Sequence, residues 1–129
     1  MTQFSNNKTN NYDLEERTAK FGEGVIDLVR SIKINTINDS VIKQIIRSAT
    51  SVGANYCEAN NASSKSDFRN KIYICKKETS ETKYWLRMLS KTNSELKNQT
   101  RKLWQEAQEL NLIFQKIVNS INKKKREKV

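Results

Sequence analysis

The sequence predicts an all-α protein, an antiparallel up-down-up-down bundle of four helices. Apolar residues recur at intervals of three and four in four segments, which is the spacing of residues on one face of a helix. The 129 residues include no proline and three glycines, and this disfavours a turn-rich β fold. The polar connections between the segments are short, so consecutive helices are expected to run antiparallel. The length suits a single domain.

Polar residues delimit the first two helices. Residues 1–11 are rich in Asn and Thr, so we expect a disordered tail before a bundle that spans residues 12–122. The stretch NTIND ends the first helix, and Asn38 or Asp39 is available as the N-cap of the second. The two apolar faces consist of Leu14, Thr18, Phe21, Val25, Leu28 and Ile32, and of Ile42, Ile45, Ala49, Val52, Tyr56 and Ala59.

The third and fourth helices show the same signals. Ser64 and Asp67 have the spacing of a capping box before the third helix, and the stretch TNSELKNQT precedes the fourth. We expect helices of about 20–27 residues, ~30–40 Å long. A basic tail at residues 123–129 would continue the fourth helix. The two apolar faces consist of Phe68, Ile72, Cys75, Thr79, Thr82, Leu86 and Leu89, and of Leu103, Ala107, Leu110, Phe114, Ile117 and Ile121.

The residue inventory argues against catalysis. The chain has no histidine, which removes the commonest general base and the commonest metal ligand.

Neither a secretory h-region nor a membrane-spanning apolar run is visible, so we expect a cytoplasmic protein with reduced thiols. Cys57 and Cys75 would lie about 10 Å apart along the helix axes, beyond disulfide reach, and are expected to be small core hydrophobes. We expect no cofactor.

Three glutamates leave one alternative open. Glu78 and Glu81 have the i, i+3 spacing of ligands in helical bundles, and with Glu58 they could form an all-carboxylate site for Mg²⁺ or Ca²⁺. Salt bridges to Lys77, to Arg47 or to a neighbouring subunit explain the same residues more simply. We therefore expect ion pairs at these positions and no metal.

The net charge is unevenly distributed along the chain. Of the formal charge of +10, residues 1–39 contribute −1 and residues 40–129 contribute +11. A basic surface of this size favours nucleic acid as the partner, and the alternative is a lysine-rich face that only aids solubility. The expected phosphate contacts are one sector of the third helix and the C-terminal cations: Lys65, Arg69, Lys76, Lys83, Arg87, Lys91, Lys123, Lys124, Lys125 and Arg126.

A second apolar row lies on the third helix, away from its core face. It consists of Ile74, Trp85 and Met88, accompanied by Glu78 and Glu81. A helix in a single bundle needs one apolar face, and aromatic residues concentrate in interfaces. We therefore interpret this row as the contact surface of a homo-oligomer. The alternative is that the row belongs to the core and that the core face is rotated.

One glycine stands in the interior of the second helix. Glycine at such a position costs about 1 kcal/mol relative to alanine, so Gly53 needs a compensating role. Together with Ala49, it is expected on the inward side of the helix, opposite bulky residues of the third helix. Small side chains allow two helix backbones to approach closely, and we predict close helix packing at this point.

Two stretches of the sequence together resemble a known family. RSATSVGANYCEA and DFRNKIYICKKETSETKYWLRML are similar to the four-helix bundle proteins encoded in intervening sequences of bacterial large-subunit ribosomal RNA genes. That family is distantly related to the accessory variability determinant proteins of diversity-generating retroelements. The matching positions are Gly53, Ala54, Asn55, Glu58, Ala59, Phe68, Lys71, Glu78, Glu81, Tyr84, Trp85 and Leu86.

The resemblance implies an all-α homopentamer with a central channel, a basic surface suited to RNA or DNA, and no enzymatic activity. Combined with the charge pattern, it favours a non-enzymatic homo-oligomer that binds structured RNA or RNA–DNA hybrid through phosphate contacts. A protein-interaction scaffold, such as an accessory subunit of a reverse transcriptase, is the second hypothesis. A carboxylate-metal enzyme is the third.

Overall fold

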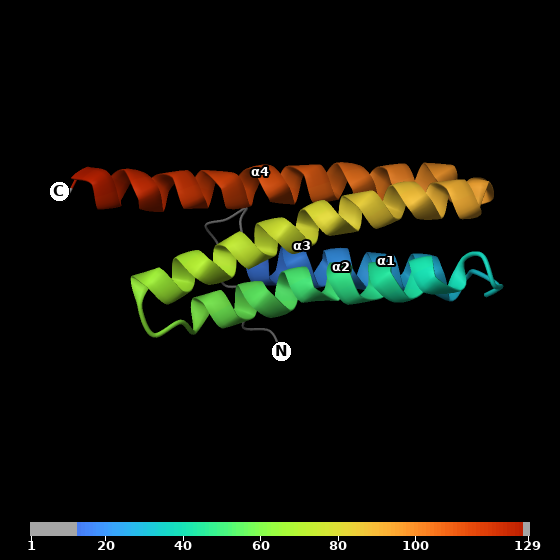
Figure 1. Ribbon diagram of the computed structural model, residues 1–129, viewed down its shortest axis with the longest axis horizontal. Helices are drawn as coiled ribbons and strands as arrows, with labels where there is room; N and C mark the ends of the chain where they lie inside the picture. Colours follow the sequence, from blue (N-terminus) through green and yellow to red (C-terminus); the bar gives the residue numbers. More distant parts are fainter. Residues whose placement is uncertain (1–12, 128–129) are drawn as a thin grey trace.

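Four antiparallel α-helices form the fold of the computed structural model, which describes residues 13–127 and the side chains up to Lys124 (Figure 1). The helices are α1 (Leu14–Arg30), α2 (Asp39–Asn60), α3 (Lys65–Thr92) and α4 (Lys97–Glu127), and a 3₁₀ turn, η2 (Ser94–Leu96), precedes α4. Within this range there is no strand, and the predicted all-α fold is confirmed. The tail predicted at residues 1–11 lies outside the described residues.

Side chains in the loops fix where the helices begin. The hydroxyl of Ser64 accepts a hydrogen bond from the backbone N–H of Asp67 (3.0 Å), so the predicted cap of α3 is confirmed. Asn38 occupies the N-cap position of α2, but its side chain makes no capping hydrogen bond. It is buried instead, and its amide donates to Oδ1 of Asn93 (3.1 Å). This bond joins the α1–α2 loop to the turn between α3 and α4.

The four predicted apolar faces meet in one core. Each large apolar side chain that is fully buried in this core stabilises the fold by about 1.5–3 kcal/mol relative to an exposed position. Residues near the ends of the faces, such as Phe68 and Ile121, are half-buried. None of the described helices combines the length and the apolarity needed to cross a bilayer. The largest fully buried apolar side chains come from all four helices: Val25, Ile45, Val52, Ile72, Leu86, Leu89, Leu110, Phe114 and Val118.

The helix lengths differ more than the sequence pattern suggests. α1 has 17 residues, whereas α3 has 28 and α4 has 31, so all three lie outside the expected range. Residues 92–100 were expected to form a connection, but Asn93 alone separates α3 from η2, which leads directly into α4. Leu96 is buried within this turn. Burial of Leu96 therefore makes the turn part of the core, and the two long helices nearly meet.

Because α1 is short, it covers only part of α4. Arg17, in the first turn of α1, binds Glu106 (Nε–Oε2, 2.8 Å) and Glu109 (Nη2–Oε1, 2.7 Å) before the midpoint of α4. Beyond that level α4 continues alongside the N-terminal half of α3, where Asn122 donates to the hydroxyl of Tyr73 (3.3 Å) (Figure 1). At this end α2 stops level with the first turn of α1, where the side-chain amide of Asn60 donates to Oε2 of Glu15 (2.8 Å), and α3 and α4 continue beyond both helices.

Gly53 marks a close approach of α2 to α1. A Cβ atom at position 53 would lie 3.2 Å from Oγ1 of Thr18 and 3.4 Å from the carbonyl atoms of the same residue. A Cβ at Gly22 of α1 would in turn lie 3.6 Å from the carbonyl oxygen of Ala49, which is fully buried. The expectation that Gly53 opposes the third helix is therefore wrong, because this side of α2 faces the backbone of α1.

Replacing Gly53 with leucine is expected to lower the melting temperature, because the added atoms must displace Thr18 or the α1 backbone. Overpacking of this kind costs about 1–3 kcal/mol. Gly53→Ala should have a smaller effect, because the better helix propensity of alanine offsets a contact that is only slightly too close. Thermal unfolding followed by circular dichroism measures both variants. A leucine variant that melts like the wild type would contradict a close-packing role.

Candidate nucleic-acid interface

Six basic residues of α3 form the row that the sequence predicts as a phosphate contact, here called the α3 row. Three of its members are exposed and three are half-buried. None of the six makes an ion pair with an acidic residue in the part of the chain that the structure describes. Their charge is therefore available to an external anion. The α3 row consists of Lys65, Arg69, Lys76, Lys83, Arg87 and Lys91.

Two half-buried members of the α3 row lie in the seam between α3 and α4. The ammonium group of Lys76 donates to Oε1 of Gln115, and that of Lys83 donates to Oε1 of Gln108. Lys83 also stands over the indole ring of Trp104, 4.6 Å from the ring centre. These partners are neutral, so they hold the two lysines in place without cancelling their charge.

The α4 side of this seam is a polar stripe that the sequence analysis missed. The side-chain amide of Asn111 donates to the hydroxyl of Ser80 (2.8 Å) and to the carbonyl of Lys76 (3.3 Å), both on α3. The stripe was visible in the sequence as a polar set at helical spacing, next to the apolar face of the fourth helix. Its members are Trp104, Gln108, Asn111, Gln115 and Asn122.

The acidic residues in the middle of α3 and α4 lie on sides of the bundle other than the α3–α4 seam. Those of α4 bind Arg17 of α1, as described above. Those of α3, Glu78 and Glu81, bind Arg47 of α2. Opposite charges are thus paired at the α1–α4 and α2–α3 contacts, and the α3–α4 seam keeps cations and neutral amides. This segregation gives one side of the bundle an uncompensated positive charge.

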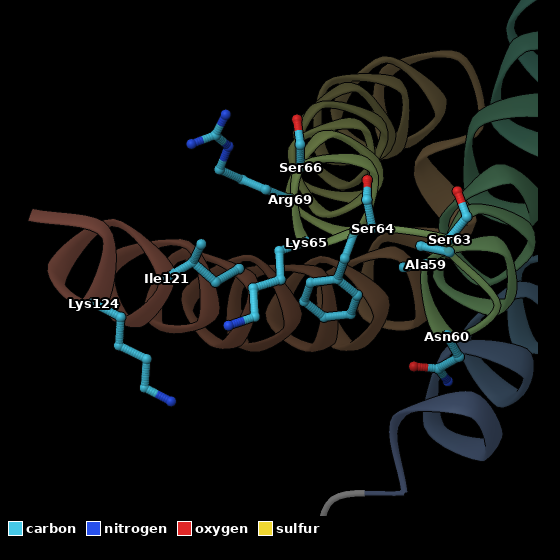
Figure 2. Close-up of a pocket in the computed structure, with 11 residues that line it drawn as sticks. Ala59, Asn60, Ser63, Ser64, Lys65, Ser66, Arg69, Ile121 and Lys124 are labelled. Atoms are coloured by element: carbon cyan, nitrogen blue, oxygen red, sulfur yellow. The ribbon is translucent and has the colours of Figure 1, made fainter. Parts of the chain in front are cut away.

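The α3 row leads to a groove at the end of the bundle where α2, α3 and α4 meet (Figure 2). The groove has a volume of about 690 Å³, and Lys65, Arg69 and Lys124 are among the residues that line it. Lys123 is exposed next to Lys124 on α4, whereas the side chains of Lys125 and Arg126 lie outside the described residues. The structure therefore brings together predicted cations from α3 and from the end of α4.

The predicted oligomer surface of α3 contains a hydrogen-bonded network with α2. Nη1 of Arg47 donates to Oε1 of Glu78 (3.2 Å), Nη2 of Arg47 donates to Glu81, and the indole N–H of Trp85 donates to Oε2 of Glu81 (3.0 Å). The Trp85 bond, followed by the Arg47 bond, lowers the pKa of Glu81. Both carboxylates thus form ion pairs with Arg47. Lys71 similarly binds Glu58, and the described residues include no cluster of three potential metal ligands.

The apolar members of this surface lie partly in the core. Ile74, Trp85 and Met88 are half-buried, and the latter two pack against the core cluster. Tyr84 is 52% exposed, and its ring meets the Trp85 ring edge-on with the centres 5.0 Å apart. The inner edge of the row therefore packs against the core, in line with the alternative interpretation, and its outer edge presents aromatic surface.

Glu81 is expected to make the stability of the protein sensitive to acid. Its pKa is lowered in the folded state, so its contribution is present above the ordinary value of 4.5 and is lost as the pH falls through the lower folded pKa. Glu81→Gln should therefore destabilise the protein at neutral pH, by about 1 kcal/mol for a partly exposed pair. Urea unfolding across a pH series measures the difference, which should disappear in acid. A stability difference between wild type and Glu81→Gln that stays constant across the pH series would contradict a stabilising role of the ionised Glu81 carboxylate.

The two cysteines differ in their surroundings, and both thiols are free. Cys75 is buried, its thiol donates to the carbonyl of Val52 (3.6 Å), and burial raises its pKa to about 12. Cys57 is exposed, so the expectation that it is a core hydrophobe is wrong. It borders a hollow between α1 and α2, where partial burial and the nearby Glu15 raise its pKa. Neither thiol is activated as a nucleophile.

Comparison with known proteins gives two similarities. The model of the 23S rRNA-intervening sequence protein family matches residues 10–126. A crystal structure from Bacteroides thetaiotaomicron, described as a protein with unknown function from the S23 ribosomal protein family, is 33% identical to this chain. The alignment covers 81% of this chain and 97% of that chain, with a TM-score of 0.72. No curated protein matches. Because the family match spans all but the ends of the chain, the protein belongs to the 23S rRNA-intervening sequence protein family.

Proposed function

We propose that this protein binds nucleic acid in the cytoplasm, with RNA preferred, and that it acts by binding and not by catalysis. The observation that carries the proposal is the α3 row, which is free of ion pairs with described residues and lies along a seam of neutral amides. From Lys65 to Lys91 the row extends ~40 Å along α3. Cations at this spacing track a phosphate backbone, and each contact releases counterions.

The chemistry of the row predicts how the nucleic acid is recognised. Lysine and arginine contacts to phosphates position a backbone and carry no direct sequence information. Sequence preference should therefore be slight. Two exposed rings lie beside the α3–α4 seam with the cations, namely Tyr73 (43% exposed) and Trp104 (38%). Such rings stack on unpaired bases, which supports RNA with single-stranded parts as the preferred ligand.

A fluorescence-anisotropy titration across a salt series tests this proposal. The probes are a labelled structured RNA, a DNA duplex and an RNA–DNA hybrid. We expect the logarithm of the affinity to fall linearly with the logarithm of the salt concentration, by about 0.9 per phosphate contact on duplex DNA and about 0.7 on single strands. Absence of binding to all three probes at low salt would overturn the proposal.

We further propose that the protein assembles into a homo-oligomer, with a pentamer as the specific expectation from the family resemblance. The support in this chain is the aromatic outer edge of α3, where Tyr84 and Trp85 lie side by side. Assembly would repeat the α3 row several times in one particle. A long nucleic acid that engages several copies then binds much more tightly than it binds one copy.

A protein-interaction scaffold is the second candidate function, for instance an accessory subunit of a reverse transcriptase in a diversity-generating retroelement. The aromatic outer edge of α3 favours this function as well, because an edge at which Tyr84 is 52% exposed suits a protein partner. The two functions differ in salt dependence. A partner that binds through this edge should be retained at high salt, whereas a nucleic acid held by the α3 row should be released.

A further inference from the structure

We propose that the groove at the end of the α3 row holds an unpaired nucleotide of the bound nucleic acid, with its base against Phe68 and its phosphates against the surrounding cations. This inference rests on the proposed function and names the part of the ligand that one place would take. The groove lies where α2 ends, α3 begins and α4 extends beyond the reach of α1 (Figures 1 and 2).

The lining of the groove combines an apolar surface with hydroxyl groups. Ala59 of α2, Phe68 of α3 and Ile121 of α4 supply the apolar part. The serines at positions 63, 64 and 66 supply hydroxyls along the loop and the first turn of α3. Phe68 is half-buried, so one part of its ring is fixed by the core while another part faces the groove. A volume of about 690 Å³ lies within the range of small-molecule sites.

The charge of the lining selects an anion. Lys65, Arg69 and Lys124 line the groove, and no acidic residue is among the lining residues described. Figure 2 shows the ammonium groups of Lys65 and Lys124 extending from adjacent helices toward the same side of the groove. An anionic ligand with a flat apolar part satisfies both the cations and the Phe68 ring, and a nucleotide has this combination of phosphate and base.

Continuity with the α3 row favours a nucleotide over an acidic peptide. Lys65 and Arg69 belong both to the row and to the groove, so a backbone that follows the row arrives at the groove. A base within a duplex is stacked between its neighbours, and its faces are not free for Phe68. An unpaired base has a free face, and stacking on an aromatic side chain is tolerant of sequence. The ligand is therefore a single-stranded end, bulge or loop adjoining a paired region.

The experiment compares a blunt RNA duplex with the same duplex carrying a short single-stranded extension that contains 2-aminopurine. We expect the extended RNA to bind the wild type about tenfold more tightly, with 2-aminopurine fluorescence quenched by stacking. Phe68→Leu should remove the quenching and most of the preference, whereas Phe68→Tyr should retain both. Ile46→Ala is the matched control, because Ile46 is also half-buried against the core but lies on α2 outside the groove.

A second variant keeps the test valid if Phe68→Leu does not fold. Ser66 is exposed in the first turn of α3, where glutamate is favourable for a helix, so Ser66→Glu places a negative charge in the groove without a packing cost. It should reduce the preference for the extended RNA severalfold. Ser94→Glu, at an exposed position of η2 at the other end of the bundle, is its control.

The outcomes separate this inference from the proposed function. Equal, salt-dependent binding of the blunt and extended duplexes would overturn the groove proposal and leave nucleic-acid binding intact. The same conclusion would follow if a folded Phe68→Leu variant, or Ser66→Glu, kept the wild-type preference. If the protein binds neither the blunt duplex nor the extended duplex, both proposals are overturned.

Discussion

We expect about a hundredfold or greater loss of RNA affinity at low salt when four members of the α3 row are replaced together by glutamine: Arg69, Lys76, Lys83 and Arg87. Each lost phosphate contact should also flatten the salt dependence, by about 0.9 in the log–log slope for duplex DNA and about 0.7 for single strands. Anisotropy titrations of wild type and variant across a salt series measure the affinity and the slope together.

The quadruple variant should remain folded. Arg69 and Arg87 make no ion pair with described residues, and Lys76 and Lys83 bind neutral amides. Glutamine retains a donor at each position. The clearest loss is the contact of Lys83 with the Trp104 ring, which is worth about 0.5–1 kcal/mol at an exposed site. An unchanged helical signal in circular dichroism is the expected check.

A matched control separates this surface from the net charge of the protein. Four exposed cations of α1, the α1–α2 loop and α2 can be replaced by glutamine, which changes the net charge by the same amount: Lys20, Arg30, Lys33 and Lys43. This control should keep most of the affinity. Equal weakening of both quadruple variants would mean that the protein attracts nucleic acid only as a general polycation, and would remove the α3 row as the site.

Much of the fold follows from the period of the apolar residues, because each helix buries one face and the four faces together form one core. The loop chemistry adds helix boundaries, as Ser64 shows. The sequence pattern does not reveal which neighbour a face meets. Gly53 was placed correctly on the inward side of α2, yet its neighbour is Thr18 of α1 and not α3. That choice depends on the rotation of packed helices about their axes, which a single-helix pattern does not contain.

The candidate site shows the same limit. The α3 row is visible as one sector of a helix, but the amides that hold Lys76 and Lys83 belong to α4 and become relevant only when the two helices pack. The groove depends on tertiary structure even more strongly. It exists because α2 ends level with the first turn of α1, where Asn60 donates to Glu15, whereas α3 and α4 continue beyond that level.

Trp85→Ala is expected to shift the assembled protein toward monomer. With Tyr84, the indole forms the aromatic outer edge of α3, and truncating an aromatic anchor in an interface costs about 2 kcal/mol or more, roughly a thirtyfold weaker association. The substitution also removes the bond to Glu81 and some core packing, so the bundle itself should melt at a lower temperature. Sedimentation velocity well below that temperature, with circular dichroism on the same sample, separates dissociation from unfolding.

Two further variants decide what a shift toward monomer means. Trp104→Ala removes the chain's other indole, which lies on α4 beside Lys83 and away from the α2–α3 network, so it should leave the assembly intact. Trp85→Phe keeps apolar area but cannot donate to Glu81, so it should assemble if the contact is apolar and dissociate if the Glu81–Arg47 network orients the surface. A wild type that sediments as a monomer would refute the interface. If the Trp85→Ala variant assembles to the same extent as the wild type, the interface lies on another face of the bundle.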